Sequence, residues 1–209
     1  MESEHFVLCG RRIRLEPLEH RHVDGLVAAA AVDPSIYRWS LVPQGEDAVT
    51  RYVGTAIAWR EAGTAVPFAI VRADDGAVIG STRFWAMERW SWPEGHAQYG
   101  RSTPDVCEIG YTWLTAPAVR TAVNTEAKLL MLTHAFEVWQ MCGVCLHTDR
   151  RNERSRAAME RMGARLDGVL RAHRMASDFT PRDSARYSIV AAEWPDVKAR
   201  LERLRDKYD

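Results

Sequence analysis

Three segments of the 209-residue sequence carry side chains whose types and spacing could do chemistry. In the first, LTAPAVRTAVNTEAK (114–128), a strand-like pattern gives way to small residues and then to a helix that begins near Asn124. The first N–H groups of a helix are unpaired and carry the positive end of its dipole, so small residues before them let a phosphate approach. An ordinary helix capped by Asn124 explains the same residues. The segment alone leaves both interpretations open.

The second segment is TDRRNERSRAAMERMGAR (148–165), which follows a strand pattern and begins another helix. Asn152 and Ser155 lie three residues apart at the helix start, and both side chains can donate hydrogen bonds. The same turn is rich in arginine: Arg150, Arg151, Arg154 and Arg156. A phosphate-rich ligand would suit this chemistry. A capped helix with a solvated, arginine-rich face would suit it equally well.

The third segment is the apolar strand CEIGYTWLT (107–115), which carries one carboxylate, Glu108. Such a group is solvated at a sheet edge, salt-bridged, or a general base with a raised pKa. The residues alone favour a structural role. We also interpret His134, in the middle of a helix, and His147, in the middle of a strand, as structural histidines.

The cysteines suggest a redox or metal site only weakly. Cys142 and Cys145 form a CxxC pair, which is typical of a redox centre or half of a zinc site, but no second Cys or His pair stands at ligand spacing. Together with Cys9 and Cys107 we predict them to be reduced and buried. The sequence therefore predicts no metal.

The composition of the chain narrows the classes of binding partner. Twenty-eight basic residues balance 28 acidic ones, which gives no overall charge for binding nucleic acid or a membrane surface. The sequence has no run of about 18 apolar residues, as a membrane helix needs, and no signal-peptide pattern. We therefore expect a cytoplasmic protein without nucleic-acid or membrane partners.

Hydrophobic periodicity predicts alternating strands and helices in a single domain over residues 1–209. The predicted strands are 11–18, 67–73, 77–85, 107–115, 144–149, 165–173 and 185–192. The predicted helices are 20–32, 45–63, 124–141, a short helix ending at Gly163 and a C-terminal helix with Val197, Leu201 and Leu204 inward. Asp75-Gly76 predicts a hairpin turn. The pattern indicates α/β or α+β layers around one sheet.

Residues 86–105 form a long predicted loop that is rich in aromatic side chains. Loops of this length are uncommon in compact domains and are often functional. Its rigid aromatic groups, Trp90, Trp92, His96 and Tyr99, suit a pocket or a partner surface. They suit a loop that packs on its own domain equally well.

The sequence resembles the GNAT acetyltransferases, and more narrowly the branch that contains the ribosomal-protein N-terminal acetyltransferases. The similarity covers about residues 10–205 without the loop 86–105. Four segments carry it in order: EIGYTWL (108–114), VNTEAKLLMLTHAFE (123–137), TDRRNERSRAAMERMGAR (148–165) and RDSARYSIVAAEWPDVKARL (182–201). The resemblance implies a mostly antiparallel mixed sheet of about six or seven strands, splayed in the middle, with helices on both faces.

The resemblance also implies a binding site for acetyl-CoA as co-substrate. The family's pyrophosphate loop, Gln/Arg-x-x-Gly-x-Gly/Ala, matches Val119 to Asn124 best, with Ala122 at the central glycine. A register shifted by one residue places Arg120 at the Gln/Arg position instead. The implied cofactor contacts are Trp113, Leu114, Arg120, Thr121, Ala122, Val123, Asn124, Thr125, Asn152 and Ser155. Because glycine allows positive φ and close approach, alanine keeps the site only if φ stays negative.

Acetyl transfer to an amine needs a base, a polarised carbonyl and a proton for the thiolate. In this family context we predict Glu108 as the general base, backbone N–H groups near Trp113 and Leu114 as the polarising donors, and Ser155 as the proton source. The expected acceptor contacts are Trp85, Trp90, Trp92 and Tyr111. Tyr187 and Tyr111 are weaker catalytic candidates.

The acceptor itself is left open by the sequence. It is a protein N-terminus or a small-molecule amine, and the enzyme is expected to be a monomer or a homodimer. The alternative is a degenerate GNAT fold that senses acyl-CoA or mediates assembly, which the missing loop glycines favour and the Asn152–Ser155 pair opposes.

Overall fold

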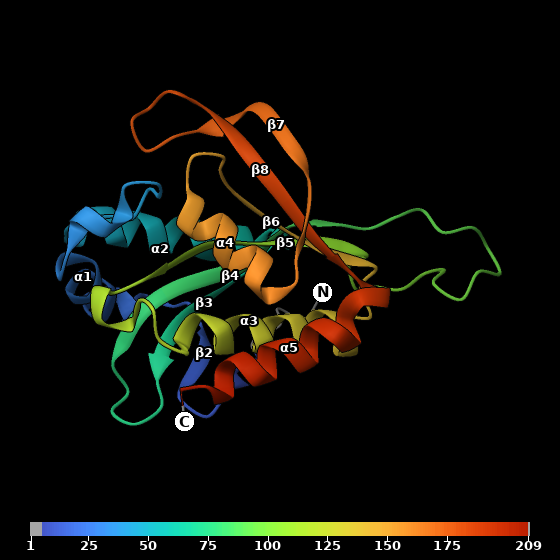
Figure 1. Cartoon of the computed structure of the whole chain (residues 1–209), viewed down its shortest axis with the longest axis horizontal. Coiled ribbons are helices and arrows are strands. Elements are labelled where there is room, and N and C mark those ends of the chain that lie inside the picture. Colours follow the sequence, from blue (N-terminus) through green and yellow to red (C-terminus); the bar gives the residue numbers. More distant parts are fainter. Residues whose placement is uncertain (1–5, 209) are drawn as a thin grey trace.

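The computed structural model describes residues 6–208, in which eight strands form one mixed sheet in the order β1-β2-β3-β4-β5-β6-β8-β7 (Figure 1). Neighbouring strands are antiparallel except β5 and β6, which are parallel. The strands are β1 (Leu8–Cys9), β2 (Ile13–Pro17), β3 (Ala65–Arg72), β4 (Val78–Glu88), β5 (Val106–Leu114), β6 (Gly143–Asp149), β7 (Arg165–Met175) and β8 (Pro181–Val190).

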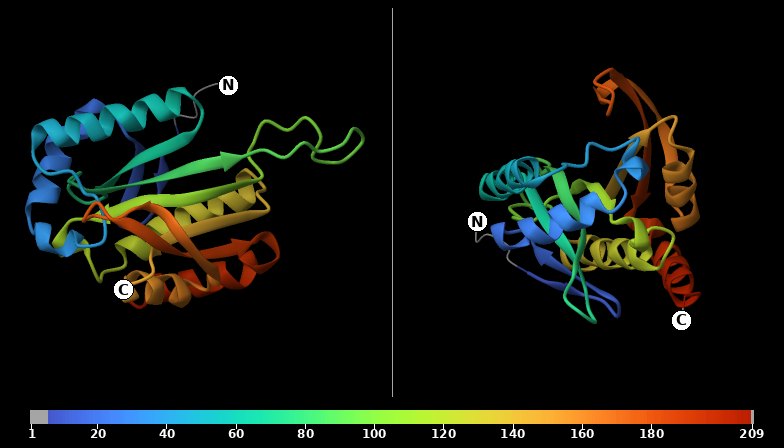
Figure 2. Two further views of the ribbon diagram at one scale, coloured as in Figure 1. Left: turned by 90° about the horizontal axis from the view of Figure 1, so that it is seen from above. Right: turned by 90° about the vertical axis from the view of Figure 1, so that its left-hand side faces the viewer.

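Helices cover both faces of this sheet (Figures 1 and 2). They are α1 (Val23–Ala31), α2 (Glu46–Glu61), α3 (Val123–Thr133), α4 (Glu153–Met162) and α5 (Trp194–Asp206). Short turns are η1 (His20–His22), η2 (Pro34–Tyr37), η3 (Ala116–Ala118), η5 (Ala191–Glu193) and the π-helical turn η4 (His134–Val138). A smaller core lies beneath α1 and α2, and a larger one joins the sheet to α3, α4 and α5.

The predicted fold class is confirmed: a mixed, mostly antiparallel sheet is splayed in the middle and carries helices on both faces. The sheet has one strand more than the seven predicted, because β1 is only two residues long and has no readable alternation. The limits of the predicted domain 1–209 stay a prediction, since residues 1–5 and 209 lie outside the described residues. No helix among residues 6–208 is both long enough and apolar enough to cross a membrane.

The helix expected over 124–141 begins one residue earlier and changes type before it ends. Its α-helical part is α3, and η4 continues the chain to Val138. The predicted apolar stripe is nevertheless buried, namely Leu129, Leu132, Phe136 and Trp139. Helical spacing of apolar residues therefore located the buried face correctly, while the π turn has no signature in that spacing.

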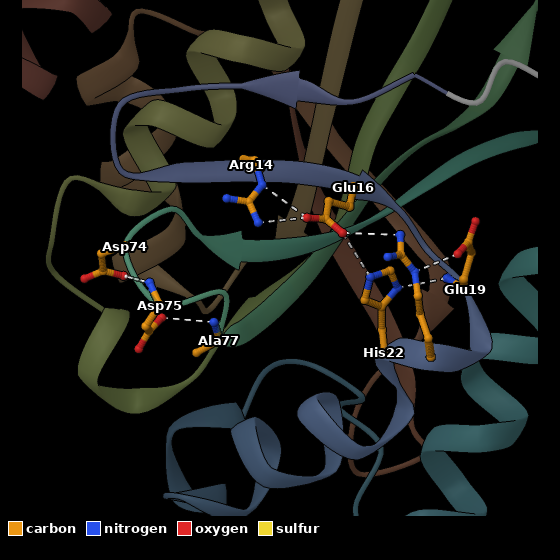
Figure 3. A network of polar contacts seen from close by, with 8 residues as sticks. Arg14, Glu16, Glu19, His22, Asp74, Asp75 and Ala77 are labelled. Atoms are coloured by element: carbon orange, nitrogen blue, oxygen red, sulfur yellow. Dashed lines mark hydrogen bonds and ion pairs between the residues drawn. The ribbon is translucent and has the colours of Figure 1, made fainter.

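A polar network fixes the start of α1 against β2 (Figure 3). Glu16 on β2 accepts hydrogen bonds from Arg14, and its other oxygen lies 3.4 Å from Nε2 of His22. His22 in turn accepts a hydrogen bond from the backbone N–H of Glu19 through Nδ1. Figure 3 also shows the β3–β4 turn, where Asp75 accepts from the backbone N–H of Ala77. That turn is the hairpin predicted from the Asp-Gly step.

The long loop between β4 and β5 begins at residue 89, because β4 continues to Glu88. It projects away from the rest of the molecule in Figure 1 and in the left view of Figure 2. Asp105 anchors its base, because its carboxylate accepts from the backbone N–H of Trp90 at 2.7 Å and from Nε1 of Trp92 at 2.8 Å. Trp92 also stacks on His96 with 4.3 Å between ring centroids.

Candidate active site

A cleft opens where β5 and β6 separate. The two strands pair only from Val106 to Glu108 on β5 and from Gly143 to Cys145 on β6, after which each keeps only its other neighbour. Two residues of β5, Tyr111 and Thr112, lie opposite one residue of β4, and Tyr111 has a φ of 52°. A bulge of this kind turns backbone groups away from the ladder and toward the opening.

The bulge depends on Gly110. A Cβ atom at this position would lie 2.7 Å from Nε1 of Trp85 and 3.0 Å from Oε1 of Glu108. The cleft beside the bulge has a volume of about 640 Å³, which is ample for an extended organic ligand. Eight of the predicted cofactor or catalytic residues line it: Glu108, Trp113, Leu114, Arg120, Thr121, Asn124, Asn152 and Ser155.

The N-terminus of α3 faces this cleft and differs from the prediction in its cap. The helix begins at Val123 with Ala122 before it, so Asn124 lies in the first turn and is not the N-cap. The Thr121 hydroxyl accepts from the N–H of Val123 at 3.3 Å, which leaves the next N–H groups of the first turn for a ligand. Ala122, Val123 and Thr125 are buried behind Thr121 and Asn124.

The missing loop glycines are compatible with the backbone. Ala122 has a φ of −66°, so its methyl group causes no strain. Arg120 has a φ of 64° and takes the left-handed conformation that glycine favours. Because its side chain also lines the cleft, the chain accepts a strained backbone where it gains a cation next to an anion-binding helix start. These residues fit a pyrophosphate.

Asn152 is the N-cap of α4, at the helix start where the sequence placed it. Its Oδ1 accepts from the backbone N–H of Ser155 at 3.1 Å. Because the oxygen is used for the cap, the amide N–H₂ group is the part of this side chain that a ligand can use. Ser155 and Arg154 lie on the same turn and line the cleft.

Glu108 is salt-bridged and buried, with 2 % exposure. Arg174 on β7 donates to both its oxygens, at 3.1 and 2.7 Å. His147 Nδ1 lies 2.8 Å from Oε2, but off the direction of a hydrogen bond, so neither ring nitrogen has a hydrogen-bond partner among residues 6–208. Burial raises the pKa of Glu108, but His147 and Arg174 outweigh it and lower the pKa to about 2. The raised pKa that a strong general base needs is not found.

The ligand atoms of Glu108, Cys145 and His147 lie within 4.8 Å of one another, a grouping that could hold a metal ion. Two features of the donors fit a metal poorly. Arg174 already occupies both oxygens of Glu108, and burial, with Glu108 nearby, raises the pKa of the Cys145 thiol to about 12. All four cysteines are free thiols, but only Cys107 is fully buried, and Cys9 is exposed, contrary to the prediction.

Lys128 is a cleft residue that the sequence interpretation missed. It lies one turn after Asn124 on α3, is 4 % exposed, and its Nζ donates to the Thr112 hydroxyl at 2.6 Å. Burial lowers its pKa to about 7. One signal was available in the sequence, because the chain has only three lysines among its 28 basic residues. Lysine, unlike arginine, can become neutral in a protein.

The predicted acceptor residues separate into two groups. Tyr111 lines the cleft, and Trp85 supports it from behind, with 5.1 Å between their ring centroids. Trp90 and Trp92 lie on the projecting loop and are not among the residues that line the cleft. Tyr187 is buried and donates its hydroxyl to Glu160, which is a packing role.

Comparisons with known proteins agree with this geometry. Residues 12–165 match the acetyltransferase (GNAT) domain family. A structure from T. thermophilus named as an acetyltransferase is 35 % identical, with 95 % of this chain and 96 % of that chain covered and a TM-score of 0.76. No curated protein sequence matches the chain significantly.

Two solved structures with bound cofactor share the fold at lower identity. RimJ from Mycobacterium smegmatis, in complex with CoA-disulfide, is 20 % identical with a TM-score of 0.77, covering 97 % of this chain and 96 % of that chain. RimL, a ribosomal alpha-N-protein acetyltransferase in complex with coenzyme A, is 15 % identical with a TM-score of 0.71, covering 88 % and 98 %. The chain belongs to the GNAT family and is an acyl-CoA-dependent acetyltransferase.

Proposed function

We propose that this enzyme transfers the acetyl group of acetyl-CoA to a primary amine by direct attack within a ternary complex. The observation that carries the proposal is the continuity of one cleft from the start of α3, past the bulge of β5, to Glu108. Phosphates would bind at Arg120, Thr121 and Asn124. The pantetheine arm would run along β5 and meet Asn152 and Ser155. The fold is shared with RimL, which is named as an alpha-N-protein acetyltransferase, and this supports a protein N-terminus as one acceptor.

The chemistry assigns a separate task to each group. The amine nitrogen attacks the thioester carbon, a C–N bond forms and the C–S bond breaks. Backbone N–H groups beside the bulge stabilise the oxyanion. The Ser155 hydroxyl gives a proton to the departing thiolate and regains one from solvent. The proton that the nitrogen loses goes to a base in the cleft.

Two cleft residues are candidates for that base. Glu108 is the one predicted from the sequence, but with a pKa of about 2 it is a weak base at neutral pH. Lys128 has a pKa of about 7, so about half of its side chains are neutral at that pH. Its Nζ reaches the cleft beside the bulge through Thr112. We therefore assign Lys128 as the group that accepts the proton. Glu108 has a positioning role, because it holds the Arg174 guanidinium in place.

The activity is tested by titration calorimetry with acetyl-CoA, followed by thiol release against a panel of primary amines. We expect saturable binding and release of one thiol for each acetylated amine. Binding without turnover on any amine would favour the acyl-CoA sensor instead. The absence of acetyl-CoA binding would contradict both functions.

Replacing Asn152 separates its capping role from its ligand role. Asn152→Ala removes both the cap and the amide donor, so we expect a stability loss of about 1 kcal/mol and a roughly three- to tenfold weaker acetyl-CoA affinity. Asn152→Ser is the matched control, because serine is also a good N-cap but lacks the amide. It should keep the melting temperature and still bind acetyl-CoA more weakly. Unchanged dissociation constants in both variants would refute the contact.

A further inference from the structure

The wall of the cleft near Glu108 contains more positive charge than its one carboxylate balances. Arg174 on β7 and Arg182 on β8 lie directly opposite each other in the strand register, and both line the cleft. Arg174 forms a salt bridge with Glu108. Arg182 has no carboxylate within 4.0 Å among residues 6–208 and donates only its Nε, to the Ser184 hydroxyl at 3.1 Å. The terminal nitrogens of Arg182 are therefore available to a ligand.

A third guanidinium reinforces this field from behind. Arg83 on β4 is 1 % exposed, and its guanidinium carbon lies 4.2 Å from the ring centroid of Tyr111 and 4.7 Å from that of Tyr52. Its Nε and Nη2 have no hydrogen-bond partner, and no acid among the described residues pairs with it. Cation–π contacts with Tyr111 and Tyr52, which both line the cleft, hold this charge just beneath the surface.

The acidic side chains nearest to this wall already have other hydrogen-bond or ion-pair partners. Asp149 accepts two hydrogen bonds from the Arg151 guanidinium, at 2.9 and 2.7 Å. Asp183, the neighbour of Arg182, accepts from the backbone N–H of Ala172 at 2.9 Å and lies 3.7 Å from Arg150. The excess charge at Arg182 is therefore not neutralised from within the described part of the chain.

This charge belongs to the acceptor end of the cleft and not to the phosphate end. Glu108 and Leu114 are six residues apart on β5, about 20 Å in an extended strand, and the start of α3 follows Leu114. The hairpin that carries Arg174 and Arg182 also reaches across the cleft, where Ser177 Oγ donates to the carbonyl of Arg38 at 2.5 Å. Arg182 is thus held above the space where an acceptor must enter.

Resting on the proposed function, we propose that the acceptor carries a carboxylate close to its reacting amine and that Arg182 binds this carboxylate. The carboxylate is the side chain of an acidic residue next to a peptide N-terminus, or the α-carboxylate of a free amino acid. A guanidinium gives such a group a charge-assisted, bidentate site. The surrounding cations also favour the neutral form of the acceptor amine, which is the nucleophile. Polycationic amines are repelled by the same field.

The test compares acceptors that differ in charge only. Three tetrapeptides with a free N-terminus and Glu, Gln or Lys as second residue are assayed by thiol release, beside free glutamate and an amino acid amide. The Lys side-chain amine is trimethylated, so that it keeps its positive charge but cannot accept an acetyl group. We expect kcat/KM to fall in the order Glu, Gln, Lys, with about tenfold or more between Glu and Lys. Activity on free amino acids but not on their amides or on peptides would identify the α-carboxylate as the recognised group.

Variants assign this preference to Arg182. Arg182→Gln should remove the preference for Glu over Gln, and Arg182→Glu should reverse the order toward Lys, with the KM for acetyl-CoA unchanged in both. Arg171→Gln is the matched control, because Arg171 is an exposed arginine on β7 outside the cleft. Equal, measurable rates with all three peptides, or a preference that survives in Arg182→Gln, would overturn the proposal. Binding of acetyl-CoA without turnover on any acceptor would instead contradict the proposed function.

Discussion

Replacing Lys128 by methionine is expected to make the protein more stable and less active at pH 7. Burial lowers the pKa of Lys128 from 10.5 to about 7. That shift corresponds to a destabilisation on the order of 5 kcal/mol whenever the unfolded lysine is charged and the pH is at or below 7. Methionine has a similar shape without the charge but loses the hydrogen bond to Thr112, so we expect a net gain of about 3 kcal/mol.

The sign of the pH dependence follows from the lowered pKa. Between pH 7 and about 10.5 the unfolded chain holds a proton on Lys128 that the folded chain has released. The stability of the wild type therefore rises with pH across this window. Lys128→Met should lack this rise. Urea denaturation at several pH values between about 6 and about 10, which spans most of this window, measures the difference between the two proteins.

The pH dependence of kcat/KM tests whether Lys128 takes part in catalysis or is only buried in the fold. If Lys128 accepts the proton, kcat/KM of the wild type rises with pH through about 7, and this limb disappears in Lys128→Met. Lys198→Met is the control, since Lys198 is half-exposed and paired with Glu137, and it should change stability by less than about 1 kcal/mol. A Lys128→Met enzyme with an unchanged pH–rate profile would exclude the assigned role.

The sequence was informative where local rules determine structure. The Asp75-Gly76 turn and the buried stripe of α3 follow from turn chemistry and helical spacing, and both are found. The family resemblance supplied the mostly antiparallel mixed sheet and the splay that opens the cleft. Side-chain pairs between distant segments could not be predicted in this way. Arg174 is 66 residues from Glu108, and only the tertiary fold brings its guanidinium to that carboxylate.

The environment of Lys128 could not be predicted from the sequence either. Its helix position was predicted correctly, but its pKa depends on burial against Thr112 and on the absence of a nearby acid in the described part of the chain. Neither can be read from the spacing of residues along α3. Similarly, the aromatic loop 86–105 suggested acceptor contacts, whereas Asp105 binds Trp90 and Trp92 to the base of a projecting arm.

Replacing Glu108 by glutamine is expected to have the second large effect. Unlike Lys128→Met, this change should make the protein less stable. Its pKa is lowered from 4.5 to about 2, so the ionised carboxylate contributes roughly 3 kcal/mol above pH 4.5, which is lost as the pH falls through about 2. Glu108→Gln should lose about 2 to 3 kcal/mol at pH 7, since the Arg174 side chain is 28 % exposed and can regain some water. The difference from the wild type should shrink steadily below pH 4.5.

The pH–rate profile of Glu108→Gln decides between the two candidate bases. Because Arg174 loses its anchor, we expect kcat to fall by tenfold or more, on the order of one charge-assisted contact, with little change in the affinity for acetyl-CoA. The limb near pH 7 should remain at a lower plateau if Lys128 takes the proton. Loss of that limb in Glu108→Gln, together with its survival in Lys128→Met, would return the role of base to Glu108. The pair of variants thus tests whether this cleft uses a carboxylate or a neutral amine to accept the proton from its substrate.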